Sequence, residues 1–147
     1  EGILTSVYYL ESNAEYDCMT SYCVVGGYGD LPLEKESKFN WLMFDSYAFR
    51  FYDDNSKFPM DIANYNRIKV SKGANPLRVK SNFNGLGIYR PSCFKENYYS
   101  VLNHGQDQLT DIDHVTFHKM MENKGMSVFM NPSMITCVSK HRYSEDY

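Results

Sequence analysis

The sequence lacks long apolar runs, paired cysteines at metal-binding spacing and clusters of basic residues. No apolar run approaches the ~18 residues of a membrane-spanning helix. Zinc-ribbon pairs of the Cys-x-x-Cys type are absent, so free core thiols are expected, and the cellular compartment stays open. The four scattered cysteines are Cys18, Cys23, Cys93 and Cys137. A net charge of −3 without a basic run argues against a nucleic-acid partner.

A recognisable phosphate-binding glycine loop is also lacking. The glycine cluster at 26–30 contains neither the Gly-Lys-Ser/Thr of a P-loop nor the helix start of a dinucleotide site. A plain turn is therefore the expected structure there.

Aromatic residues, in contrast, are abundant. Tyrosine occurs 13 times and phenylalanine 9 times, against a single tryptophan. A tyrosine ring packs on an apolar face while its hydroxyl forms hydrogen bonds, which suits flat, polar ligands such as sugars. The alternative is that the tyrosines fill half-buried positions of a sheet.

The 147 residues are long enough for one domain with its own core, and we expect a single domain over residues 1–147. Hydrophobic spacing predicts a helix over Gly2–Leu10, and alternation predicts a strand over Tyr16–Val25. Further strands are expected over Trp41–Tyr47, Leu77–Ser81 and Gly85–Tyr89, with a long loop over Lys57–Pro76. This order of elements predicts an α/β fold in which a mixed β-sheet is flanked by helices.

The last third of the chain is expected to hold a helix followed by two strands. Thr110 or Asp111 can cap the helix, because Thr110 followed by Asp113 approximates a capping box, and Gly125 ends it. The two strands, Met126–Met130 and Met134–Val138, are expected to flank a turn at Asn131-Pro132.

Acids and histidines gather where this helix begins. Asp111, Asp113, His114 and His118 fall within its first turns, where the helix dipole favours ionised carboxylates. His114 and His118 lie at i, i+4, a spacing that can hold zinc in a hydrolase, although no third ligand is evident. Upstream, the glycines of Asn84-Gly85-Leu86-Gly87 allow the backbone to pass close to a ligand or a neighbouring strand.

The order of these motifs resembles the C-terminal half of a nucleotide-sugar glycosyltransferase of the GT-A type, a partial Rossmann-like fold. The similarity is to cap-type mannosyltransferase-like and viral glycosyltransferases. Its motifs are the Asn84–Gly87 loop, the run from Asp113 to His118, Gly125, Asn131-Pro132 and a late histidine, His141. A segment from Phe44 to Arg50, with Phe58-Pro59 after it, matches another motif of these enzymes.

The resemblance implies sugar transfer from a nucleotide-sugar donor to a glycan or another hydroxyl acceptor. Asp113 would be the base that removes the acceptor proton. Asn84, Gly85, Gly87, Asp45, Arg50 and His118 would contact the substrates. His141 would help to bind a divalent metal, Mn²⁺ or Mg²⁺, on the donor diphosphate.

The chain departs from the family pattern in two respects. The family motif ends in a second acid, where this chain has His114, so that Asp113, His114 or Asp111 could take the proton. The resemblance also implies that the donor-binding N-terminal half of the catalytic domain precedes this portion. A non-catalytic glycan-binding or assembly module that keeps part of the fold is therefore the alternative function.

Overall fold

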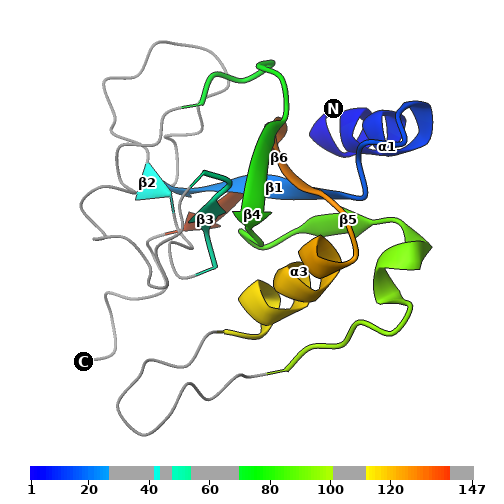
Figure 1. Ribbon diagram of the computed structural model, residues 1–147. Helices are drawn as coiled ribbons and strands as arrows, with labels where there is room; N and C mark the ends of the chain where they lie inside the picture. Colours follow the sequence, from blue (N-terminus) through cyan, green and yellow to red (C-terminus); the bar gives the residue numbers. More distant parts are fainter. Residues whose placement is uncertain (27–41, 44–47, 54–69, 101–111, 140–147) are drawn as a thin grey trace, which may run out of the picture.

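A computed structural model describes residues 1–26, 42–43, 48–53, 70–100 and 112–139 of the chain. Within them lie two α-helices, α1 (Gly2–Ser12) and α3 (Asp113–Asn123), and one 3₁₀ helix, η1 (Pro91–Phe94). The strands are β1 (Cys18–Gly26), β2 (Leu42–Met43), β3 (Arg50–Phe51), β4 (Leu77–Ser81), β5 (Gly87–Tyr89) and β6 (Val128–Ser139). Figure 1 shows the two α-helices on either side of the strands.

The described strands form one six-stranded sheet in the order β2-β1-β6-β4-β3, with β5 paired to β1. β1 and β6 run parallel, whereas every other pair is antiparallel. The protein is therefore an α/β protein with a mixed sheet, as its sequence predicts. The expected helix at Gly2–Leu10 and the expected strands at Tyr16–Val25 and Leu77–Ser81 are confirmed as α1, β1 and β4.

β1 separates two hydrophobic clusters because its side chains alternate between the two faces of the sheet. Met19, together with Phe129 of β6, packs under Leu10 of α1. Cys18 and its neighbours on the other face pack under Phe117 of α3. The helices thus cover opposite faces of the sheet, giving three layers.

β6 corrects the prediction of two strands separated by a turn at Asn131-Pro132. It is one strand of 12 residues that pairs with β1 over residues 128–131 and again over residues 135–139. The register shifts between Ser21 and Tyr22 of β1, which pair with Asn131 and Ile135, so residues 132–134 bulge out. Pro132 fits such a bulge because it has no backbone N–H to donate to the ladder. The Asn-Pro pair therefore marks an irregularity inside a strand.

α1 packs against this bulge with Gly2 and Ser6, two residues whose side chains are absent or small. Asn131 Nδ2 donates to Ser6 Oγ at 2.8 Å, and Asn131 Oδ1 accepts from the backbone N–H of Ser133 at 2.9 Å. A Cβ added at Gly2 would lie 2.0 Å from the carbonyl oxygen of Ser133. Gly2 is therefore needed for the close approach of helix and strand.

Gly2→Ala is accordingly expected to destabilise the protein by about 1–3 kcal/mol, the usual cost of overpacking a tight contact. The matched control is Leu4→Ala on the same helix, because the Leu4 side chain is 75% exposed. Urea unfolding measures both. Equal stability of the two variants would show that α1 does not dock as described.

α3 begins later than its capping motif predicts. The helix starts at Asp113 with Ile112 at the N-cap and without a side-chain cap, and the predicted capping residues Thr110 and Asp111 lie outside the described residues. Its end is as predicted. Gly125 has φ of +75°, and the N–H of Met126 reaches back to the carbonyl of Met121 at 3.0 Å, which is a Schellman closure.

Candidate functional site

A tight turn, residues 83–86, follows β4. Asn84 and Gly85 have φ of +50° and +87°, and the N–H of Leu86 donates to the carbonyl of Phe83 at 3.3 Å. Two successive positive φ angles define a type I′ turn, for which Asn-Gly is the preferred pair. The predicted strand at Gly85–Tyr89 is therefore shorter, and β5 begins at Gly87.

This turn is fixed over the two parallel strands. The carbonyl oxygen of Asn84 accepts from Ser21 Oγ at 2.7 Å and from Thr136 Oγ1 at 2.6 Å. The N–H of Ser21 donates to the carbonyl of Leu86 at 2.9 Å. The turn is thus held at the same level of β1 and β6 as the bulge.

Asp113 and His114 form a carboxylate–imidazole pair at the start of α3. One carboxylate oxygen, Oδ1, contacts the imidazole Nδ1 at 2.9 Å and accepts from the backbone N–H of His114 at 2.8 Å. The side chains are 49% and 21% exposed for Asp113 and His114, respectively. Among the described residues, the second oxygen, Oδ2, has no hydrogen-bond partner.

Aromatic rings join this pair to the turn. Phe83, the first residue of the turn, stacks on the imidazole of His114 with ring centroids 3.9 Å apart. Tyr99 approaches the same imidazole edge-on, at 5.2 Å. The start of α3 and the Asn-Gly turn, 27 residues or more apart in the chain, therefore lie side by side.

His118, one helical turn further on, is a buried residue of the core. Its Nδ1 lies 2.9 Å from Ser81 Oγ, and its Nε2 lies 2.9 Å from the phenol oxygen of Tyr89. Burial, with a smaller contribution from His114, lowers the pKa of His118 to about 3, so the ring is neutral. Zinc bound by both histidines would have to displace Ser81 or Tyr89.

The other predicted site residues lie in other strands or outside the described part of the chain. Gly87 is in β5, where an added Cβ would lie 2.7 Å from the ring of Tyr89. Arg50 is in β3, and its Nη1 donates to the carbonyl of Phe49 at 2.8 Å. Asp45, Asp111 and His141 lie outside the described residues.

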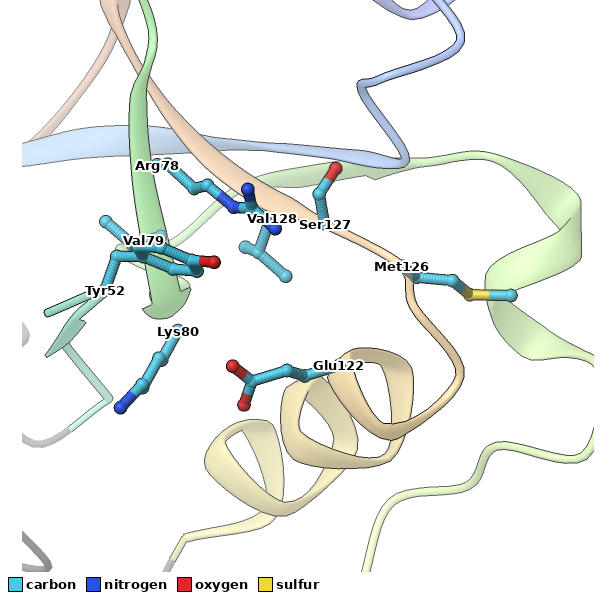
Figure 2. A pocket seen from close by; sticks show the side chains of 8 residues that line it. All are labelled: Tyr52, Arg78, Val79, Lys80, Glu122, Met126, Ser127 and Val128. Atoms are coloured by element: carbon cyan, nitrogen blue, oxygen red, sulfur yellow. The ribbon is translucent and has the colours of Figure 1, made fainter. Parts of the chain in front are cut away.

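A small, solvent-open recess lies at the opposite end of α3 (Figure 2). Lys80 of β4 and Glu122 of α3 line it from facing elements, and the guanidinium of Arg78 lies 4.2 Å from the ring centroid of Tyr52. Sequence reasoning missed this recess. The only local sequence signal for the recess was the alternation of side chains along β4, which places Arg78 and Lys80 on the same side of the strand.

Sequence reasoning also missed Phe83 and Tyr99, since their contacts with His114 connect residues that are distant in the chain. Among the residues that the structure describes, no three His, Cys, Asp or Glu side chains gather as a metal site. The predicted ligand His141 is outside that set, so a bound Mn²⁺ or Mg²⁺ stays a prediction.

No family model matches the chain, and no curated protein or solved structure matches it either. Neither α-helix of the described part has the length and apolar character needed to cross a membrane.

Proposed function

We propose that the chain is the acceptor-side part of a GT-A type glycosyltransferase, which transfers a sugar from a nucleotide-sugar to a hydroxyl acceptor. The supporting observation is the contact between Phe83 and His114, with ring centroids 3.9 Å apart. It brings together the glycine turn and the acidic helix start, the two motifs on which the family resemblance chiefly depends.

The chemistry of this place suits a base. Transfer forms a bond between the acceptor oxygen and the anomeric carbon, breaks the bond from that carbon to the diphosphate, and releases the acceptor proton. Asp113 Oδ2 takes the proton, while His114, bound to Oδ1, holds the carboxylate in one orientation. A general base of this kind contributes roughly 10²–10⁴-fold to a rate.

His114 is thus a positioning residue in the proposal. It stands where the family pattern has a second acid, and its direct contact with Asp113 makes the two side chains one unit. The divalent metal that the resemblance implies remains part of the proposal, with His141, which lies outside the described residues, as its predicted ligand.

The deciding experiment titrates the chain separately with nucleotide-sugars, with Mn²⁺ and with neutral oligosaccharides, and follows binding by calorimetry. The transferase proposal expects neutral oligosaccharides to bind this chain, and a nucleotide-sugar to bind and donate its sugar when the donor-binding half is also present. Glycan binding without any nucleotide-sugar binding or transfer would instead favour the non-catalytic glycan-binding module.

A further inference from the structure

Five aromatic rings form a continuous row beside the Asp113–His114 pair. The centroids of neighbouring rings are 5.5, 4.6, 5.2 and 3.9 Å apart along the row. In order, the row consists of Phe94, Phe117, Tyr99, His114 and Phe83. It starts at η1 and ends at the Asn-Gly turn, and we call it the aromatic row.

Two members of the aromatic row expose much of their surface. Phe94 is 52% and Tyr99 is 46% exposed, although both contact the fully buried Phe117. Tyr98, next in the chain, is 65% exposed. Neighbouring large aromatic side chains that remain exposed on one side are a feature of binding surfaces.

The exposed rings are held in fixed orientations. Tyr99 stacks on Phe117 with an interplanar angle of 10°. Phe94 packs edge-on against Tyr89 at 5.4 Å. Rigid aromatic side chains lose little conformational entropy when they bind a ligand.

The chemistry of the surface favours a carbohydrate. The C–H groups on one face of a pyranose ring pack on an aromatic face, while its hydroxyls bond to phenols and carboxylates. Nucleic-acid bases also stack on such rings, but single-strand binding needs a positively charged groove. Here the carboxylate of Asp113 adjoins the row at His114, and Lys95 and Glu96 of opposite charge follow Phe94, on a chain of net charge −3 without a basic run.

We infer that Phe94 and Tyr99 bind the pyranose ring of a neutral acceptor glycan and place its hydroxyl at Asp113. Tyr99 lies close to Asp113, because the Tyr99 ring contacts His114 and the His114 imidazole contacts the Asp113 carboxylate. The glycan-binding part of this inference stands by itself. The delivery of the hydroxyl to Asp113 rests on the proposed transferase function.

The binding test uses saturation-transfer NMR with mannotriose, cellotriose and maltotriose as probes on the full chain. Phe94→Ala and Tyr99→Ala are each expected to weaken binding of the preferred trisaccharide about tenfold, the loss of one stacking contact. Tyr99→Phe keeps the ring and is expected to stay within about twofold of wild type. The control Tyr8→Ala removes a more exposed tyrosine, 66% exposed on α1, and is expected to leave trisaccharide binding unchanged.

Several outcomes would overturn the inference. They are the absence of trisaccharide binding, binding that Phe94→Ala and Tyr99→Ala leave unchanged, and preferential binding of a deoxythymidine decamer. The amide NMR spectrum of each variant separates a lost contact from a lost fold, and Phe94→Ala provides a second variant should Tyr99→Ala unfold.

Failure of the surface and failure of the transferase proposal give different results. If transfer occurs but Phe94→Ala leaves the acceptor KM unchanged, the inferred surface is wrong and the transferase proposal stands. If trisaccharide binding depends on Phe94 but nucleotide-sugars neither bind nor react, the surface stands as a glycan-binding site. The transferase proposal then fails.

Discussion

Asp113→Asn is expected to lower the rate of sugar transfer in the complete polypeptide by about 10²–10⁴-fold, the usual contribution of a general base. The asparagine amide keeps an oxygen that can accept from the backbone N–H of His114, a bond of 2.8 Å in the wild type. It cannot take a proton from the acceptor hydroxyl. The effect is therefore expected in kcat, measured by release of the nucleoside diphosphate, with the free energy of unfolding almost unchanged.

Glu122→Gln is the matched control for this variant. It removes an exposed carboxylate from the same helix, at the end that lines the Arg78–Glu122 recess. Its rate is expected to stay within about twofold of wild type. Near-normal turnover of Asp113→Asn, or a large loss of activity in Glu122→Gln alone, would show that the catalytic base does not lie at the start of α3.

The second large effect concerns stability and pH. His118 has a folded-state pKa of about 3, lowered first by burial and then by His114. The ordinary value is near 6.5, so the unfolded chain binds more protons than the folded one between these two pH values. Stability therefore falls as the pH drops below about 6.5, and the contribution of His118 between pH 6.5 and 4.5 is about 2 kcal/mol.

Urea unfolding at pH 7 and pH 4.5 measures this dependence. His118→Gln keeps an amide that can donate and accept between Ser81 and Tyr89 but does not titrate, so its stability is expected to vary less with pH. The control His114→Gln leaves the burial of His118 in place and is expected to retain most of the dependence. If wild type and His118→Gln lose the same stability on acidification, His118 is not the neutral buried group described here.

Elements with local signals could be predicted from the sequence. Alternation identified β1 and β4, hydrophobic spacing identified α1, and Gly125 identified the end of α3, each through a physical cause that acts within a few residues. The prediction of two strands in place of β6 was wrong because Asn131-Pro132 is a sequence pattern typical of a turn. β6 pairs with β1 on both sides of residues 132–134, which form a bulge that the local sequence pattern does not reveal.

The candidate site could be predicted only in part, for the same reason. The Asn84–Gly87 loop and the Asp113–His114 motif were recognised, but nothing local placed Phe83 against His114. The burial of His118 depends on Ser81 and Tyr89, which lie 37 and 29 residues away in the chain. A histidine that faces a ligand and one that bonds within the core therefore look alike in sequence.

The most direct test of the central claim, that the turn at residues 83–86 and the start of α3 together bind the substrates, is an amide NMR map of the chain. Spectra are recorded while a nucleotide-sugar and a trisaccharide are added together. The largest shifts are expected at Gly85, Tyr99 and His114, with none at Leu4 on the opposite layer. Shifts confined to Lys80, Glu122 and Ser127 around the recess, with Gly85 and His114 unchanged, would contradict the claim.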